Sequence, residues 1–448
     1  MTSTAAITPL KAQRAWTRPR PNRGLMGLLG IVNRWLLLLG LPLLRRIPFV
    51  RDLPLVRGYF WIRRIDLPAA DRARLASAVN TGTAAFIGPN HPEFGTDWLV
   101  DKELSTMVAP VMASWADSGI VAAAPRFWGM NNLIANNGGD AAKDYSVEQA
   151  VAGAGVLLHP EGTVRWTNDV VHPLFPGIAQ MAMKAAAAGD KPVFIVPVVW
   201  KYHYVSDVSA RTHREMGIIE RALGLPNERG LIVPLRFSAL QNNLLAKRMR
   251  HFGYEEPDSA RGFFERQAAF QQFLVDALEQ RHVAEHSPDV DKRVARLARA
   301  IRSKLADARH EAASGNTEYR TALKHDLAVA EEAKRLGECT RAVYGTPLLT
   351  QEQVYECLKR IRDRLMRQGW RNVLANMLPR PFGPRVVHVS VPEPLTVTRE
   401  GATSGSAYEA SLLALARTRM QQSLDAINVR IAPEVQRQAH ENPLVTPR

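Results

Sequence analysis

The chain has 448 residues, 46% of them hydrophobic, and a formal charge of +15. This length and composition exclude a peptide or a wholly disordered chain, and they predict two or three domains with a sizeable core. Residues 1–64 contain twelve basic residues and one acid, and so carry +11 of the charge. The rest of the chain therefore has too little excess charge for a basic groove that binds nucleic acid.

The first 64 residues predict a disordered basic tail and then a membrane-associated segment. Residues 1–23 show no apolar period, whereas residues 25–44 are apolar enough, and long enough, to suggest a spanning helix. Asn33 and Arg34 near the centre of this stretch weigh against a single span. Because arginines flank it, we expect the segment to lie in the headgroup layer of an anionic membrane, or to dip in and return. A cleaved signal peptide is disfavoured, and a buried core helix is the alternative.

Residues 65–257 predict a layered α/β domain, because short apolar runs alternate with helical patterns. We expect strands at Ala84–Gly88, Ile120–Ala124, Gly155–His159, Val193–Val199 and Leu231–Phe237. Helices are expected at Leu99–Asp117, Tyr145–Ala152 and Ile178–Ala188.

Residues 258–380 predict a helical insertion with long charged helices and almost no strand signal. The clearest helical patterns are at Asp289–Ala313 and Thr317–Leu336. Residues 381–448 are expected to complete the α/β domain and to end in an irregular tail. Their elements are a strand at Arg385–Val391 and a helix at Ala407–Ile427.

The cysteines and histidines predict neither a disulfide framework nor a metal site. Cys339 and Cys357 have no zinc-ligand spacing, and so few cysteines fit a reducing compartment. His159, His172 and His203 have no carboxylate or Cys at ligand spacing, and we interpret His159 as a packing residue. The chain has no G-x-S-x-G motif and no complete dinucleotide-binding glycine loop, which removes the main support for a hydrolase or a dehydrogenase.

One candidate catalytic pair lies after the apolar run at Ala84–Gly88. His91 stands in a turn rich in Pro, Asn and Gly, and Asp97 follows six residues later. We expect the turn to fold the carboxylate of Asp97 onto the His91 ring. A carboxylate fixes the tautomer of a histidine and raises its basicity, as removal of a proton from an alcohol requires. No Ser or Cys nucleophile is needed if the hydroxyl of the substrate itself attacks.

A second polar cluster follows the apolar run at Gly155–His159. Its members supply an acid, a permissive backbone position, a hydroxyl and a cation, from Glu161, Gly162, Thr163 and Arg165. This combination suits a phosphate or polyol headgroup, because Gly162 permits close approach and Arg165 can pair with an anionic oxygen.

Four sequence blocks in one order resemble the glycerophospholipid acyltransferase family, whose best-known members acylate lysophosphatidic acid. The blocks are Asn90-His91 to Asp97, Pro160-Glu161-Gly162-Thr163 with Arg165, Phe175-Pro176-Gly177 before a helix, and Ile195-Val196-Pro197-Val198. Val391–Leu395 (VPEPL) also resembles the ending of the family's last strand. The resemblance covers residues 84–205 and 385–430, and it implies an acyltransferase-type α/β fold.

The resemblance also implies an activity, with no cofactor and no metal. It makes His91 the general base for the acceptor hydroxyl and Asp97 the residue that orients it. The headgroup of the acceptor would be bound by Glu161, Gly162, Thr163 and Arg165. The donor would be an acyl thioester of coenzyme A or acyl carrier protein, and the acceptor a lysophospholipid, first of all 1-acylglycerol-3-phosphate. Such a protein would act in phospholipid biosynthesis at a membrane, facing the cytoplasm.

The chain departs from the family pattern at four places, the first being that the Phe175-Pro176-Gly177 block is one residue shorter than the family's. Five residues rather than four separate the His from Asp97, so Glu93 is a second candidate for its partner. Arg165 lies one position later than in the family. The phosphate-binding arginine expected near Gly129 is missing, and Arg126 is the candidate replacement.

Two other functions remain open from the sequence. One is an acyltransferase for a different lyso-acceptor, such as an amino-lipid, which the missing arginine favours. The other is a non-catalytic, basic membrane scaffold whose helical insertion binds partners, which the longer His-to-Asp spacing favours.

Overall fold

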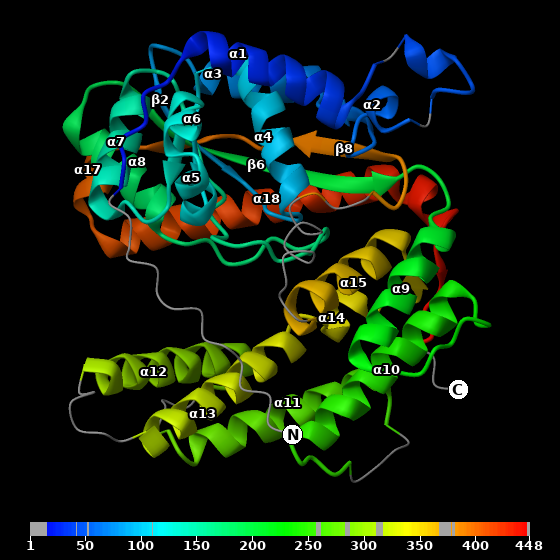
Figure 1. Cartoon of the computed structure of the whole chain (residues 1–448). Helices are drawn as coiled ribbons and strands as arrows, with labels where there is room; N and C mark the ends of the chain where they lie inside the picture. Colours follow the sequence, from blue (N-terminus) through cyan, green and yellow to red (C-terminus); the bar gives the residue numbers. More distant parts are fainter. Residues whose placement is uncertain are drawn as a thin grey trace. The chain divides into compact units, whose positions relative to one another are not determined.

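The computed structural model describes residues 16–41, 43–51, 53–109, 111–256, 261–282, 287–310, 317–366, 378 and 381–445. Most of the predicted disordered tail, residues 1–15, thus lies outside the described residues. The chain forms two compact units (Figure 1). The α/β unit comprises Met1–Asp207 and Arg367–Val435, and the helical unit comprises Val208–Met366 and Gln436–Arg448.

The α/β unit contains a mostly parallel sheet of eight strands among the described residues. Along the sheet lie β1 (Ile62–Asp66), β8 (Arg385–Ser390), β6 (Val193–Tyr204), β2 (Ala84–Pro89), β5 (Val156–Leu157), β3 (Ala113–Ala116) and β4 (Leu133–Ala135), with β9 (Leu395–Val397) also paired to β6. Strand β2 is parallel to both β5 and β6, whereas β8 and β9 run antiparallel to β6. The expected α/β class is confirmed, and the strand predicted at residues 385–391 does join the sheet.

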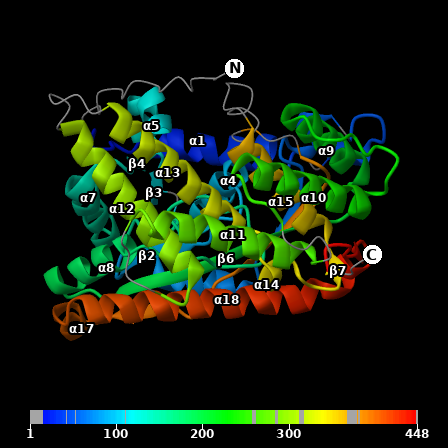
Figure 2. The same cartoon turned by 90° about the horizontal axis from the view of Figure 1, so that it is seen from below.

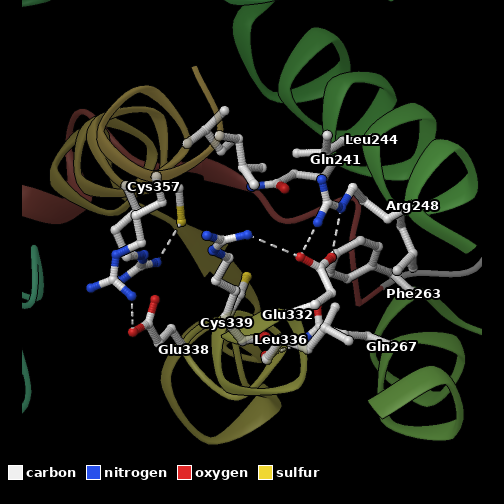
Figure 3. A pocket seen from close by; sticks show the side chains of 16 residues that line it. Gln241, Leu244, Arg248, Phe263, Gln267, Glu332, Leu336, Glu338, Cys339 and Cys357 are labelled. Atoms are coloured by element: carbon white, nitrogen blue, oxygen red, sulfur yellow. Dashed lines mark hydrogen bonds and ion pairs between the residues drawn. The ribbon is translucent and has the colours of Figure 1, made fainter. Parts of the chain in front are cut away.

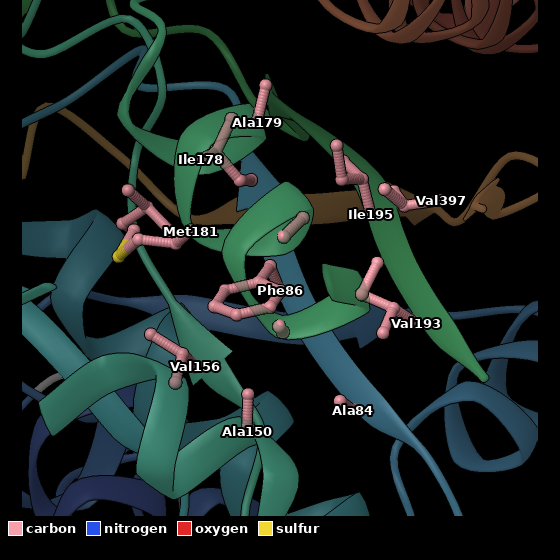
Figure 4. Close-up of a cluster of buried hydrophobic side chains, with 14 of the residues drawn as sticks. Ala84, Phe86, Ala150, Val156, Ile178, Ala179, Met181, Val193, Ile195 and Val397 are labelled. Atoms are coloured by element: carbon pink, nitrogen blue, oxygen red, sulfur yellow. The ribbon is translucent and has the colours of Figure 1, made fainter. Parts of the chain in front are cut away.

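Both faces of this sheet are buried against helices, as the continuous apolar runs of its central strands require. Alternate residues of β2 enter the two cores: Phe86 packs on one face and Ile87 on the other. The first core is covered by α7 (Gly139–Val151), α8 (Gly177–Ala188) and the N-terminal part of α18 (Ser406–Gln436). Figure 4 shows Phe86 beneath Ile178 and Met181 of α8. The second core is covered by α3 (Ala69–Ala78) and α4 (Gly95–Val108). The short α17 (Arg399–Thr403) leads into α18 beside α8 (Figure 2).

The strand predicted at Ile120–Ala124 is wrong. Residues 120–123 belong to α5 (Ser118–Ala123), and Ala124 links it to α6 (Pro125–Met130). The side chain of Asp117 caps α5 by accepting hydrogen bonds from the backbone N–H groups of Gly119 and Ile120, at 2.8 and 3.3 Å. A strand of this region, β3, lies earlier, inside the stretch predicted as a helix.

The strand predicted at Leu231–Phe237 is also wrong, because α10 (Val233–His251) begins there with Pro234 in its first turn. Proline fits that position since its missing N–H would have no partner in the first turn. The buried guanidinium of Arg236 then pairs with Glu220 of α9 (Ser209–Leu223) at 2.6 Å. Both helices belong to the helical unit, which therefore starts at Val208 rather than at the expected residue 258.

The N-terminal apolar segment is broken rather than straight. It contains α1 (Arg23–Val32) and the π-helical η1 (Asn33–Leu38), and the short η2 (Leu44–Arg46) and α2 (Pro54–Arg57) follow. Asn33 donates a hydrogen bond to the carbonyl of Leu99 at 2.8 Å, and Arg34 pairs with Glu103 at 2.8 Å, so both polar side chains bind α4. In the part of the chain that the structure describes, no helix combines the length and apolar character that crossing a membrane requires.

The helical unit confirms the two long helices predicted from the charged pattern. They are α12 (Val290–His310) and α13 (Thr317–Leu336), which pack on each other. Both also contact α11 (Phe263–Glu279), and α13 has the more extensive contact with it. The short α14 (Arg341–Tyr344) and then α15 (Gln351–Leu365) follow, and α15 packs on α9. A small antiparallel pair, β7 (Leu348–Leu349) with β10 (His440–Glu441), ties the end of the chain to this unit.

Candidate active site

The two predicted polar clusters meet at one edge of the sheet. His91 follows the end of β2, and Glu161 follows the end of β5, which is the parallel neighbour of β2. The carboxyl ends of parallel strands share an edge, which is where α/β proteins bind ligands. The backbone N–H of Arg165 also lies 3.4 Å from the carbonyl oxygen of His91, so the two loops are in direct contact.

Asn90 anchors the loop that carries His91. Its side-chain amide donates to the carbonyl of Trp200 at 3.0 Å, and its side-chain oxygen accepts from the N–H of Trp200 at 2.9 Å. This pair of bonds mimics one more step of strand pairing between β2 and β6, beyond the register that ends at Pro89 and Val198. The position of His91 is therefore fixed on its N-terminal side by β6.

The carboxylate of Asp97, on the first turn of α4, is fully buried and accepts four hydrogen bonds. One oxygen binds His91 Nδ1 at 2.7 Å and the N–H of Glu93 at 2.9 Å. The other binds Trp200 Nε1 at 3.0 Å and the Tyr202 hydroxyl at 2.6 Å. Burial raises the pKa of Asp97, and the charge of His159 and the Tyr202 hydroxyl act in the opposite direction. The contact that the spacing predicted is thus present, in spite of the additional residue between His91 and Asp97.

The ring of His91 is arranged as a base. Because Nδ1 donates to Asp97, the hydrogen of the neutral ring is on that nitrogen, and Nε2 has no hydrogen-bond partner among the described residues. The expectation that the basicity of His91 is raised is wrong, because burial lowers the pKa of His91 well below its usual value and the charge of His159 lowers it further. The ring is thus neutral at neutral pH, with 9% of its side chain exposed and Nε2 able to accept a proton.

His159 lies directly on this ring, which the sequence did not indicate. The two imidazoles are stacked, with centroids 3.9 Å apart and an angle of 10° between their planes. His159 Nδ1 lies 2.9 Å from the carbonyl of Asn90 and Nε2 lies 3.0 Å from a carboxylate oxygen of Asp101. Both partners only accept, so both nitrogens of His159 carry hydrogen and the ring is a cation. Burial alone would lower the pKa of His159, but the charge and hydrogen bond of Asp101 outweigh it and raise the pKa to about 9.

The Glu161 turn is built for close packing. Gly162 has φ +70°, and a side chain there would collide with the ring of Phe175, at 2.6 Å from an added Cβ. The backbone N–H of Phe175 in turn donates to the carbonyl of Pro160 at 2.7 Å, which brings the second and third sequence blocks together. Glu161 is buried, and burial raises its pKa to about 7, with the charges of His159 and Arg165 acting against this. Nε of Arg165 is buried without a hydrogen-bond partner among the described residues.

The other predicted site residues are placed as follows. Thr163 is exposed next to Gly162, at the open side of the turn. Arg126 is exposed on α6, and no contact with the site is seen. Glu93, the second candidate partner of His91, instead forms a buried ion pair with Arg385 of β8 at 2.5 Å. Within the described ranges, no group of His, Cys, Asp or Glu side chains has a geometry that could hold a metal ion.

A cavity of about 190 Å³ reaches the site only at Asp101, and neither His91 nor His159 lines it. It is bounded by the N-terminal segment, α4, β3, β4 and α6, and Asp101, the partner of His159, is part of its wall. Most of the lining is apolar, including three tryptophans, Trp98, Trp115 and Trp128. A mostly apolar space therefore meets the polar cluster at Asp101.

Comparison with known proteins does not identify this site. No family model matches the chain, and no curated protein matches it.

We predict that the charge of His159 makes folding stability depend on pH. Its folded-state pKa of about 9 lies above the ordinary 6.5, so its contribution is fully present below pH 6.5 and is lost as the pH rises through 9. The free energy of unfolding from urea titrations should therefore fall by up to about 3 kcal/mol more in wild type than in His159→Gln over this range. His325→Gln, at a side chain that is 69% exposed, is the matched control. Parallel curves for wild type and His159→Gln would contradict the prediction.

Proposed function

We propose that this protein is an O-acyltransferase that moves a fatty acyl group from an acyl thioester to the hydroxyl of a lysophospholipid, first of all 1-acylglycerol-3-phosphate. The observation that carries the proposal is the neutral His91, bound through Nδ1 to the buried Asp97 at 2.7 Å and with Nε2 unengaged. This is the arrangement that removal of a proton from an alcohol needs. The blocks that resemble the glycerophospholipid acyltransferase family supply the substrate class.

The proposed reaction needs no covalent intermediate with the protein. His91 Nε2 takes the proton of the acceptor hydroxyl as its oxygen attacks the thioester carbon. The tetrahedral intermediate then collapses, the carbon–sulfur bond breaks, and the thiolate recovers the proton from the His91 imidazolium. The products are an ester and a free thiol, of coenzyme A or of acyl carrier protein. Asp97 holds the ring and its tautomer throughout, and stabilises the imidazolium while it exists.

Burial and, second to it, the charge of His159 keep His91 neutral in this scheme. A cation stacked at 3.9 Å disfavours a second positive charge, so His91 does not become protonated in the resting protein. The negative oxyanion of the intermediate forms beside the same cation. His159 therefore favours the neutral base before reaction and the negative charge that develops during it.

The cavity beside Asp101 is the proposed site for the acyl chain. Its tryptophans and the apolar residues of the N-terminal segment would bury methylene groups, each worth about 0.8 kcal/mol. A thioester whose chain occupied this space would have to extend its carbonyl past Asp101 to reach the histidine pair.

The headgroup of the acceptor is proposed to lie against Glu161, Thr163 and Arg165. Of the two arginines predicted to bind phosphate, Arg165 lies close to His91, whereas Arg126 has no contact with the site among the described residues. This observation favours, as a second candidate, a lyso-acceptor that carries less negative charge, such as an amino-lipid. The non-catalytic scaffold receives no such support, because a scaffold has no need of the buried His91–Asp97 pair.

The N-terminal segment is proposed to bind an anionic membrane surface. It exposes large apolar side chains that a folded protein would normally bury, among them Ile31 at 60%, Leu43 at 75% and Phe49 at 95%. Arg46 and Arg51 are exposed between and beside them. Apolar side chains with adjacent arginines are the combination that binds the headgroup layer of anionic lipids.

We predict that His91→Ala lowers the rate of acyl transfer by about 10²- to 10⁴-fold, because it removes the general base. Asp97→Asn should also lower the rate, since a neutral amide neither fixes the tautomer of His91 nor stabilises its imidazolium as a carboxylate does. The measurement is the formation of diacyl lipid from a defined acyl thioester and a panel of lyso-acceptors with and without phosphate. His325→Ala is the control. An unchanged rate in folded His91→Ala protein would favour the scaffold, and activity with phosphate-free acceptors alone would favour the second candidate.

A second prediction concerns the acyl cavity. Leu133→Trp on β4 enlarges a side chain of its wall and should shorten the longest acyl chain that the protein transfers. The readout is kcat/KM over a series of saturated thioesters of increasing length. Leu415→Trp, at an exposed position of α18, is the control. If Leu133→Trp lowered the rates equally for all lengths, the cavity would not be the acyl site.

A third prediction concerns the membrane. The double variant Leu43→Glu with Phe49→Glu should bind anionic vesicles at least about tenfold more weakly than wild type, because each apolar side chain contributes roughly 1.5–3 kcal/mol on burial. Vesicle co-sedimentation measures this. Val429→Glu, at a position of α18 that is 77% exposed, introduces a similar charge outside the segment and should bind like wild type. Equal binding by all three proteins would refute this role of the segment.

A further inference from the structure

Cys357, on α15 of the helical unit, is buried beside a fixed cation. Nη2 of Arg360 donates to its sulfur at 3.1 Å, and the same atom donates to the Tyr344 hydroxyl at 2.6 Å. Arg360 is itself buried, with its guanidinium 5.1 Å from the centre of the Tyr344 ring. A thiol in contact with a buried guanidinium is stabilised as the thiolate, which is the nucleophilic form of cysteine.

Cys339 lies across from it, just beyond the end of α13. Buried Gln267 of α11 fixes this turn, because its amide donates to the carbonyl oxygens of Leu336 and Cys339 at 2.6 and 2.8 Å. The thiols of Cys339 and Cys357 line the same cavity, and each shifts the pKa of the other. Two free thiols from different elements are therefore held together by the surrounding structure.

Both sulfurs face one cavity of about 100 Å³ inside the helical unit (Figure 3). Its wall also contains Arg248, Arg335 and Arg364, which pair with Glu332 and Glu338. The space is large enough for water or a molecule of similar size. Small polar reagents can thus occupy the volume next to the thiols, which a tightly packed core would exclude.

The surroundings shift the pKa values of the two thiols in opposite directions. For Cys357, burial would raise the pKa, but the hydrogen bond with Cys339 and the charge of Arg360 outweigh it and lower the pKa to about 7. For Cys339, the hydrogen bond with Cys357 and burial raise the pKa well above its usual value. About half of Cys357 is accordingly thiolate near pH 7, whereas Cys339 keeps its proton.

We propose that Cys357 and Cys339 form a peroxide-reactive thiol pair that oxidises to an intramolecular disulfide. The Cys357 thiolate attacks one oxygen of hydrogen peroxide, the O–O bond breaks, and sulfenic acid and water form once a proton is taken up. The sulfur of Cys339 then attacks the sulfur of this sulfenic acid, which releases a second water and closes the S–S bond. Two thiols lose two electrons and two hydrogens, and peroxide gains them.

The test uses the reduced full-length chain at neutral pH with hydrogen peroxide. Intact mass should fall by two hydrogens, and a digest should contain one cross-linked peptide pair joining the two cysteines. Cys339→Ser should instead give a sulfenic acid at Cys357, which a dimedone probe traps. Arg360→Met should slow the reaction at least about tenfold, whereas Arg360→Lys, which keeps the charge, should lose less.

A measurement on wild type alone guards against variants that fail to fold. The rate of peroxide consumption should rise with a midpoint near pH 7, and this midpoint should return towards that of an ordinary thiol in denaturant. Peroxide-resistant thiols in the folded chain, disulfides formed only between molecules, or the same rate folded and unfolded would each overturn the proposal.

Discussion

The carboxylate of Asp97 is the constraint on which the arrangement of the sheet edge depends. It receives hydrogen bonds from the His91 loop and from Trp200 and Tyr202 of β6. A buried carboxylate without partners costs several kcal/mol, so the loop, α4 and β6 are held in the one geometry that satisfies it. The same bonds decide which nitrogen of His91 faces outward. The orientation of the His91 ring and the folding of this sheet edge therefore both depend on the carboxylate of Asp97.

The charged side chains around Asp97 are paired so that each acid has its own partner. Asp101 holds His159 as a cation, and His159 stacks on His91 and keeps it neutral. Glu93 stays off the base because Arg385 of β8 binds it. Each acidic residue of the α4 region thus has its own cation or donor. If the carboxylates of both Glu93 and Asp97 contacted the His91 ring, the pKa of His91 would change. The ion pair of Glu93 with Arg385 prevents this.

The sequence predicted the central strands and the pairing of His91 with Asp97, and missed what depends on three-dimensional neighbours. Strands β2, β5 and β6 are apolar runs covered on both faces, which a sequence displays directly. Strand β1 is mostly polar and lies at the edge, so it gave no such signal. The contact of His91 with Asp97 followed from spacing within one loop. The stacking of His159, by contrast, joins two loops far apart in the chain, and its carboxylate partner lies on a helix face four residues after Asp97.

Helix α4 contacts both the histidine pair and the N-terminal segment. Its first turns supply Asp97 and Asp101, while Leu99 and Glu103 bind Asn33 and Arg34 of the N-terminal segment. Displacement of that segment by even part of a turn would pull on the same backbone that positions the histidine pair. Through this mechanical coupling, a ligand or membrane that bound the N-terminal segment would change the orientation of His91 without contacting His91.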